Sequence, residues 1–250
     1  MGNAKLISLL NQKGGVGKTT SSVSISSALS MKGYKVLLVD LDAQCNATTS
    51  LGVLEPDTTV YSILKGQSKL DLHPVTENLF LLPASNDLAA FDLEMSAEPG
   101  KEYLLKELLE PIDKHFDYII IDCSPTLGLL TLNALTASNY FICPVLPHHL
   151  SIAGMSKLME VTDKVQRRLN PKLTLGGIIL SQFNSRKILH QDTANVIKAH
   201  FGDKLFNSVI RENISLAEAP SSGKSIFEYA PQANGAVDYM QLTKEILKKL

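Results

Sequence analysis

Residues 11–20, Asn-Gln-Lys-Gly-Gly-Val-Gly-Lys-Thr-Thr, constrain the fold of this chain more than any other segment. The apolar run at residues 5–10 predicts a buried strand, and residues 18–31 predict a helix that ends at Gly33. The glycines therefore fall at a strand-to-helix turn. Glycine allows positive φ and close approach of a ligand, and free N–H groups at a helix N-terminus attract anions. The segment predicts a phosphate-binding loop.

The loop is a variant of the P-loop pattern. The strict pattern has a glycine five places before Gly17, where this chain has Gln12, and Lys13 adds a second cation directly before the glycines. We expect Lys18 to reach the terminal phosphates and the Thr19 hydroxyl to bind Mg²⁺. The expected nucleotide-binding residues are Gly14, Gly15, Val16, Gly17, Lys18, Thr19 and Thr20.

Two further apolar runs end in carboxylates. Residues 118–122 are a tyrosine, three isoleucines and Asp122, which we expect to hold Mg²⁺ through its water shell. Residues 36–42 end in Asp40 and Asp42, which an extended chain points the same way. We expect Asp42 to activate the attacking water and to contribute to the metal site, and Asp40 to cap the next turn or helix.

The alternation of apolar runs with helical patterns predicts an α/β fold, with a mostly parallel twisted sheet covered by helices on both faces. The 250 residues, 44% of them hydrophobic, suit a single domain spanning 1–250. Ligands of such sheets bind at the carboxyl ends of the strands. Further strands are expected at residues 36–40, 79–83, 118–122, 141–145, 177–181 and 205–210, and helices at 102–114, 156–169 and 191–201.

Composition and charge narrow the class of protein. The sequence contains no apolar run of the roughly 18 residues that a spanning helix needs and no signal-peptide pattern, so we expect a cytoplasmic protein. Cys45, Cys123 and Cys143 are far apart, which fits neither a disulfide framework nor a zinc site. Residues 1–156 carry 10 basic and 16 acidic side chains, whereas residues 157–250 carry 14 and 9. A polyanion would meet the C-terminal part, although ordinary solvated helix surface explains such an excess equally well.

Four segments together resemble the ParA/Soj family of partition ATPases, over nearly the whole chain. They are the variant loop from Lys13, residues 40–48, residues 122–125 and residues 216–221, Leu-Ala-Glu-Ala-Pro-Ser. In that family Lys13 would be the signature lysine, which reaches across an ATP-sandwiched dimer to the partner's phosphates. The resemblance implies ATP and Mg²⁺ as cofactors, with catalysis by Lys13, Lys18 and Asp42.

The resemblance also implies partners. These are a second copy of the chain on ATP binding, nonspecific DNA and a ParB-type protein that stimulates hydrolysis; no membrane partner is expected. The protein would associate with the nucleoid. Chromosome, plasmid and other cargo remain open, as do the residues of the adenine pocket, for which residues 182–184 and 211–213 are candidates.

The DNA-binding segment departs from the family pattern. Family members commonly have Pro-Arg-Asn-Val-Arg where this chain has Arg211-Glu-Asn-Ile-Ser215, so two positions that are often basic are Glu212 and Ser215. Contacts to phosphates tolerate movement of the charge. The candidate DNA contacts are therefore Arg186, which matches a family arginine, together with Lys187, Arg211, Lys224 and Lys248.

Smaller departures lie beside the predicted site. Ala43 and Cys45 stand where proline and glycine are common in the family, and Ser124 replaces a usual proline.

Two alternative functions are carried by proteins with related phosphate loops: a MinD-like or cargo-positioning ATPase, and a metabolic ATP-dependent ligase. A membrane-binding ATPase would need a free amphipathic tail, but the apolar residues of 239–250 recur at helical spacing and are expected to pack on the sheet.

Overall fold

One twisted eight-stranded sheet organises the chain in the computed structural model, which describes residues 4–148 and 151–250. The strand order is β3-β4-β2-β5-β1-β6-β7-β8, and every neighbouring pair is parallel except β3 with β4. The strands are β1 (Lys5–Leu9), β2 (Val36–Leu41), β3 (His73–Pro74), β4 (Leu79–Leu82), β5 (Tyr118–Cys123), β6 (Tyr140–Val145), β7 (Thr174–Phe183) and β8 (Leu205–Arg211).

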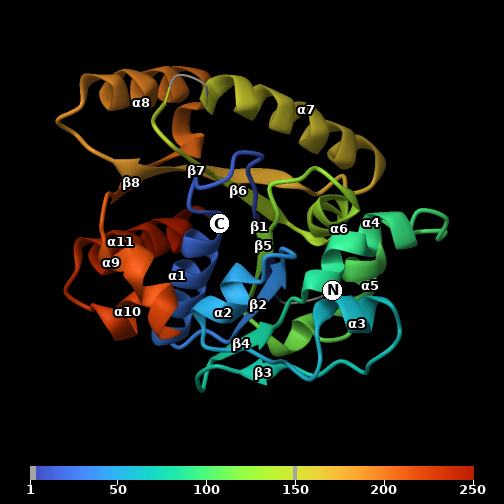
Figure 1. The fold of residues 1–250 in the computed structure, drawn as a ribbon. Coiled ribbons are helices and arrows are strands. Elements are labelled where there is room, and N and C mark those ends of the chain that lie inside the picture. Colours follow the sequence, from blue (N-terminus) through green and yellow to red (C-terminus); the bar gives the residue numbers. More distant parts are fainter. Residues whose placement is uncertain (1–3, 149–150) are drawn as a thin grey trace.

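Helices cover both faces of this sheet (Figure 1). The α-helices are α1 (Lys18–Met31), α2 (Asn46–Ser50), α3 (Val60–Leu64), α4 (Phe91–Glu94), α5 (Leu104–Leu109), α6 (Leu129–Ala137), α7 (Ser151–Arg168), α8 (Ile188–Phe201), α9 (Ser215–Glu218), α10 (Ile226–Tyr229) and α11 (Asn234–Lys249). Short 3₁₀ segments are η1 (Asn86–Ala90), η2 (Asp113–His115), η3 (Gly202–Lys204) and η4 (Ala219–Ser222).

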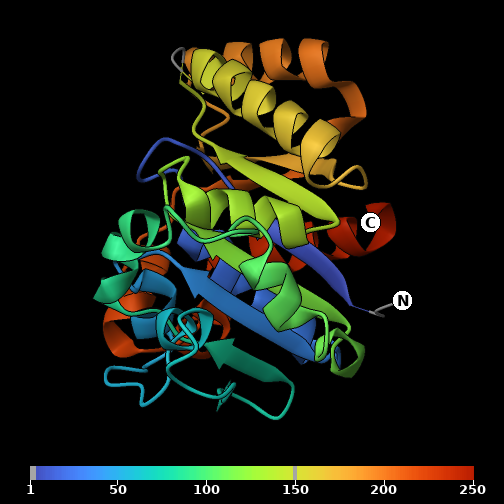
Figure 2. The ribbon, with the colours of Figure 1, turned by 90° about the vertical axis from the view of Figure 1, so that its right-hand side faces the viewer.

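The core consists of two hydrophobic layers, one on each face of the sheet. Alternate residues of a strand enter different layers: in β2, Leu37 and Val39 face the layer of α3 to α8, and Leu38 faces the layer of α1, α2, α10 and α11. In β2, β5 and most of β6 every residue is buried, as expected for parallel strands covered on both sides. Both views place α7 and α8 together at one end of the molecule (Figures 1 and 2).

The predicted architecture is confirmed: the sheet is mostly parallel, helices cover both faces, and the glycine-rich segment lies between strand β1 and helix α1. α1 has the predicted bounds and is followed by Gly33 at φ 87°. The C-terminal helix α11 buries Leu242 and Ile246 completely, as expected for a helix that packs on the sheet. Its apolar face is therefore used inside the protein.

Four predicted elements differ from the structure by three residues or more. The helices predicted at 156–169 and 191–201 begin earlier, at Ser151 in α7 and at Ile188 in α8. The predicted helix at 102–114 is wrong in extent: α5 ends at Leu109, because Pro111 lacks an N–H group and disfavours helical geometry before it.

β7 is five residues longer than predicted. It begins three residues earlier, so that Gly176 also belongs to the strand, and it ends two residues later. A Cβ atom at Gly177 would lie 2.4 Å from the Phe206 ring, so glycine allows β8 to pack there.

Candidate nucleotide-binding site

The loop between β1 and α1 presents its backbone at the carboxyl edge of the sheet, above β1 in Figure 1. Gly15 and Gly17 have φ of 72° and 85°, a region that favours glycine. Gly17 is the N-cap of α1 and provides no side-chain hydrogen bond to the first turn. The amides of that turn are therefore free to bind an anion.

Side chains from the ends of β1 and β7 fix the path of this loop. Asn11 follows β1, donates from Nδ2 to the Pro144 carbonyl at 2.7 Å and accepts the Lys13 N–H at 3.0 Å. Ser181 of β7 donates to the Val16 carbonyl at 2.7 Å, and the Gln182 amide donates to the Gly15 carbonyl at 3.3 Å. Sequence reasoning missed Asn11 and Ser181, because their partners in β6 and the loop lie more than 130 residues away.

The metal-binding candidates meet at the start of α1. Asp122 ends β5 fully buried, and the Ser22 hydroxyl of α1 donates to its Oδ1 at 2.8 Å. Its Oδ2 has no hydrogen-bond partner among the described residues. A buried acceptor without a partner is costly unless a ligand satisfies it. A carboxylate with one oxygen held and the other open fits the binding of a water of hydrated Mg²⁺.

Electrostatics support a cation at this position. Burial raises the pKa of Asp122 above its usual value, and the nearby charge of Asp40 raises it further. The hydroxyls of Thr19 and Ser22 and the ammonium of Lys18 act in the opposite direction. Burial likewise raises the pKa of Asp40, whose Cα is directly opposite that of Asp122 in the sheet. A divalent cation would relieve the repulsion between the two carboxylates.

Asp40 and Asp42 have different surroundings. The Asp40 carboxylate accepts the N–H of Thr48 at 2.9 Å, the hydroxyl of Thr48 at 2.7 Å and the N–H of Asp42 at 3.1 Å. Its predicted role in capping the next helix, α2, is confirmed. Among the described residues, the Asp42 carboxylate accepts one hydrogen bond, from the Gln44 N–H to Oδ1 at 3.0 Å, and Asp42 is 7% exposed. No described residue donates to its second oxygen, which can orient another group.

The two lysines of the loop differ in exposure. Lys18 is 7% exposed at the start of α1, within the anion-binding turn. Lys13 is exposed, and its ammonium forms no ion pair within the described part of the chain. A cation beside the phosphate loop with no partner in its own subunit is available to a second molecule.

A cavity beside the loop joins the two candidate adenine segments. Its volume is about 290 Å³, close to the lower end of the range of small-molecule sites. Asn213 lies in its wall with a buried Oδ1 that has no hydrogen-bond partner among the residues described. An amide oxygen of this kind is a suitable acceptor for an exocyclic amino group. The lining residues are Gly17, Thr20, Ser181, Gln182, Ile210, Arg211, Glu212, Asn213, Leu216, Ala217 and Tyr239.

Cys45 is not an ionised thiol. Burial and then the charges of Asp40, Asp42 and Asp87 raise its pKa to about 11. Cys123 and Cys143 are fully buried, and burial raises the pKa of each. A raised pKa disfavours the thiolate, which is the reactive form of cysteine.

The five candidate DNA contacts do not form one patch. Lys187 pairs with Glu212 at 3.3 Å, and Arg211 binds Asp238 through two nitrogens at 2.6 and 2.9 Å. Arg186 and Lys224 are exposed near the same edge as the loop. Lys248 lies apart from these four, near the end of α11 and the start of β8. Its neighbour Lys249 donates a hydrogen bond to the carbonyl of Asp203, two residues before β8.

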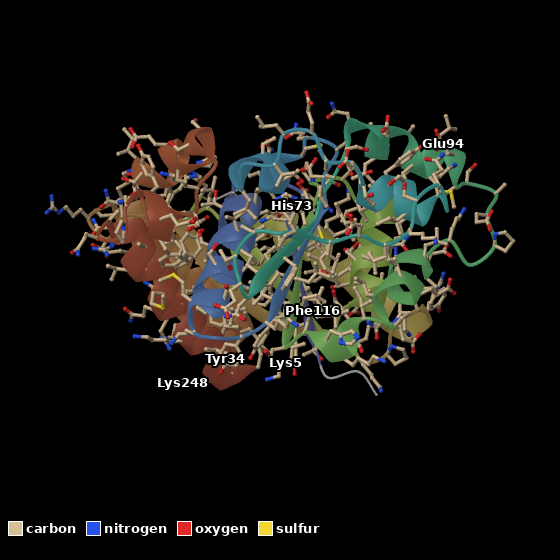
Figure 3. The ribbon with its side chains drawn as sticks, turned by 90° about the horizontal axis from the view of Figure 1, so that it is seen from below. Lys5, Tyr34, His73, Glu94, Phe116 and Lys248 are labelled. Carbon is tan, nitrogen blue, oxygen red and sulfur yellow. The ribbon has the colours of Figure 1, made fainter. Side chains whose placement is uncertain are left out.

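Figure 3 shows Lys248 on the same side of the molecule as Tyr34, which precedes β2, and Lys5, which begins β1. This is the edge opposite the phosphate loop.

The described residues include no helix long and apolar enough to span a membrane. They also contain no group of three or more histidine, cysteine or acidic side chains arranged to hold a metal ion by themselves. A metal at this site would therefore depend on bound phosphate and water for most of its ligands, as Mg²⁺ usually does.

The fold and site define a P-loop nucleoside triphosphatase with a variant Walker A loop. The model of a family described as "AAA domain" matches residues 4–175. Sporulation initiation inhibitor protein Soj of Bacillus subtilis is 42% identical, over 97% of this chain and 98% of that protein. The chain belongs to the ParA/Soj family.

Two solved structures with a similar fold contain a bound nucleotide or nucleotide analogue. A cobyrinic acid a,c-diamide synthase from Mycobacterium smegmatis with bound ADP and magnesium is 33% identical, with a TM-score of 0.85, covering 98% of this chain and 94% of that one. A plasmid partition protein from Borrelia burgdorferi bound to AMPPNP is 27% identical, also with a TM-score of 0.85, covering 99% and 100%.

Proposed function

We propose that this protein is an ATP-hydrolysing dimer switch for chromosome or plasmid partitioning. The observation that carries the proposal is Lys13, an exposed cation beside a complete phosphate loop. Similarity to Soj and to a plasmid partition protein supports the partitioning role. ATP is the substrate, and the site is proposed to act slowly until a partner stimulates it.

Different residues of the site are proposed to bind the phosphates, the adenine, the metal and the attacking water. The loop amides and Lys18 hold the phosphates, and the adenine enters the cavity beside Gln182 and Asn213. Thr19 and Asp122 would hold Mg²⁺, which supplies positive charge next to the phosphates. Asp42, with one free carboxylate oxygen, orients the attacking water. Positioning and charge are most of what such a reaction needs from protein groups.

Lys13 links hydrolysis to dimerisation. A cation supplied by a second subunit neutralises charge that accumulates on the phosphate oxygens in the transition state, as an arginine finger does. The monomer would then lack one catalytic group. ATP favours the dimer because it binds the two states with different affinity, which is the requirement for any ligand-driven switch.

DNA is the proposed surface partner of the dimer. Nonspecific binding needs only positive charge near phosphates, and a dimer presents each patch twice. Arg186 and Lys224 are exposed on the loop side, and Lys187 joins them when phosphate competes with Glu212. Arg211 acts mainly by holding the loop after β8 through Asp238, and Lys248 belongs to a second surface. Retention on duplex DNA with ATP at low salt tests this; complete absence of retention contradicts it.

A ParB-type protein is the proposed activator, and binding to DNA would place the dimer on the nucleoid. The decisive measurement is the ATPase rate alone, with DNA, and with DNA plus the candidate partner. Stimulation by both is expected. A rate that depends instead on a small organic acceptor would indicate a ligase, the function suggested by similarity to the diamide synthase.

Lys13→Ala tests the switch itself. The variant should bind ATP normally but lose turnover by a factor of about 10³, the lower range for a cation supplied in trans. Lys32→Ala, at the other end of α1 and equally exposed, is the matched control and should hydrolyse ATP normally. Unchanged steady-state hydrolysis by Lys13→Ala would remove Lys13 from the mechanism.

A MinD-like membrane function is less well supported. Most apolar side chains of α11 pack in the core, with Leu242 and Ile246 fully buried, although Val237 is exposed. Co-sedimentation with liposomes in the presence of ATP would favour that alternative, and its absence together with DNA retention would favour partitioning.

A further inference from the structure

The polypeptide leaves the sheet at the start of the phosphate loop, and one side chain continues the hydrogen bonding there. β1 pairs with β6 up to Leu9, and the Leu10 N–H still donates to the Ile142 carbonyl at 3.0 Å. Two residues further along β6, the Pro144 carbonyl accepts the Asn11 side chain instead, at 2.7 Å. The side chain of Asn11 thus takes the place of a backbone donor.

Pro144 fits this arrangement. Proline has no N–H to offer a neighbouring strand, so it is disfavoured inside a sheet unless one side lacks a partner strand. On its β7 side Pro144 is in register with Ile179, but β1 has already ended on the other side. Its carbonyl would be left without a donor if Asn11 were absent.

The other end of the Asn11 amide faces the loop. Its Oδ1 accepts the N–H of Lys13 at 3.0 Å, while Nδ2 donates to Pro144. Chemistry fixes this orientation, because an N–H needs an acceptor and a carbonyl needs a donor. Asn11 is 7% exposed, so both bonds lie in a protected environment. One buried amide therefore ties the backbone of Lys13 to the end of β6.

This tie acts on Lys13 itself, whereas Ser181 and Gln182 hold the loop three and two residues later, at Val16 and Gly15. Gly14 and Gly15 follow Lys13, and added Cβ atoms at both would meet nothing within 4 Å. Glycine lowers the cost of alternative backbone paths. Lys13 has a flexible side chain, so its reach toward a second subunit depends on where its backbone is held. Displacements of about 1 Å in a catalytic group can cost about 100-fold in rate.

We infer that Asn11 is a positioning residue for Lys13, which it holds in the orientation needed to reach a second subunit's nucleotide. The inference rests on the proposed role of Lys13 in hydrolysis. Asn11 itself makes no contact with the reacting atoms, and its removal is expected to change turnover more than nucleotide affinity.

Two substitutions of Asn11 distinguish the effects of its hydrogen bonds to Pro144 and Lys13. Asn11→Ala removes both, whereas Asn11→Ser keeps a short side-chain oxygen that can accept the N–H two residues ahead. We expect Asn11→Ala to lower the kcat of ATP hydrolysis at least about tenfold, with the ATP Kd changed by less than about threefold. Asn11→Ser should recover most of this loss. Rates are expressed per folded protein, with the folded fraction from urea unfolding.

Asn133→Ala is the matched control. Asn133 is also a fully buried asparagine, which donates to the Lys101 and Leu129 carbonyls and accepts the Leu105 N–H. It lies in α6, away from the loop. Its loss should lower stability by a similar amount while leaving turnover within about twofold, because the unmade bonds cost stability alone.

The double variant Asn11→Ala/Lys13→Ala decides how Asn11 acts. If Asn11 acts through Lys13, the double variant should be no slower than Lys13→Ala alone. Multiplicative losses, normal turnover in Asn11→Ala, or equal losses in Asn11→Ala and Asn11→Ser would each overturn the inference. Normal turnover in Lys13→Ala would instead overturn the proposed function, so the two failures are distinguishable.

Discussion

At the scale of single residues, Cys45 has a backbone conformation that disfavours a side chain; among the described residues other than glycine, Gln182 alone shares its positive φ. Its φ and ψ are 54° and 29°, the left-handed region, at the N-cap of α2. A residue with a Cβ atom pays roughly 1–2 kcal/mol for this conformation. Glycine adopts this conformation without that cost.

Cys45→Gly should therefore raise the free energy of unfolding. Relief of the backbone strain is partly offset by the greater freedom of glycine in the unfolded chain, which leaves a gain of about 0.5–1 kcal/mol. Urea unfolding at neutral pH measures it. Cys45→Ala keeps the Cβ atom and removes the sulfur, so it should give no gain. An equal gain in both variants would attribute the effect to the thiol.

At the scale of elements, Glu245 joins α11 to β8. Its carboxylate accepts the N–H groups of Asn207 and Ser208, each at 2.9 Å, and pairs with Lys249 at 3.2 Å. Burial alone would raise the pKa of Glu245, but the bonds from Asn207 and Ser208, assisted by Lys249, lower it overall. The ionised form is therefore favoured by folding.

The pH dependence follows from the sign of this shift. A carboxylate whose pKa is lowered on folding contributes stability above its unfolded pKa, near 4.5, and loses that contribution as pH falls through the folded value. Glu245→Gln should cost about 1–2 kcal/mol at pH 7 and less at pH 3. Urea unfolding at both pH values measures it, with the exposed Glu107→Gln as control. A constant cost at both pH values would contradict the assignment.

Elements that depend on local signals were predictable, and those that depend on distant partners were not. The segment from β1 through the loop to α1 follows from adjacent apolar, glycine and helical residues, and its bounds differ by at most one residue at the end of β1. The short helices α2, α3, α9 and α10 have four or five residues, too few to show a period.

The candidate site divides in the same way. Asp122 and Asp42 were found because a carboxylate at the end of a buried strand is visible in the sequence. The contact of Ser22 with Asp122 crosses 100 residues, and that of Ser181 with Val16 crosses 165. Only the sheet order brings these residues together, so a strand end alone could not indicate which side chains support the loop.

At the scale of the whole molecule, the nucleotide site lies at one edge of the sheet, where loops from both halves of the chain meet. The cavity for the proposed adenine contains the loop after β8 as well as the start of α1. Residues 211–213 therefore connect the nucleotide to the proposed DNA surface, through Glu212 and its pair with Lys187.

Asp42→Ala tests whether ATP hydrolysis is needed to dissociate the proposed ATP-bound dimer. Loss of the carboxylate that orients water should slow turnover at least 100-fold, the lower range for a group of this kind, while the phosphate loop still binds ATP. The dimer formed with ATP and Mg²⁺ should then persist for hours in size-exclusion chromatography with light scattering, and it should remain on DNA. Wild-type protein should return to the monomer as ATP is consumed.

The exposed Asp71→Ala serves as the control for this experiment and should behave like the wild type. An Asp42→Ala protein that hydrolyses ATP at the normal rate would remove Asp42 from the catalytic residues. One that fails to hydrolyse ATP yet stays monomeric would separate hydrolysis from dimerisation, and the switch would then have to rest on a contact other than the one proposed for Lys13. Persistent dimers that release DNA would show that DNA release requires neither hydrolysis nor dissociation of the dimer.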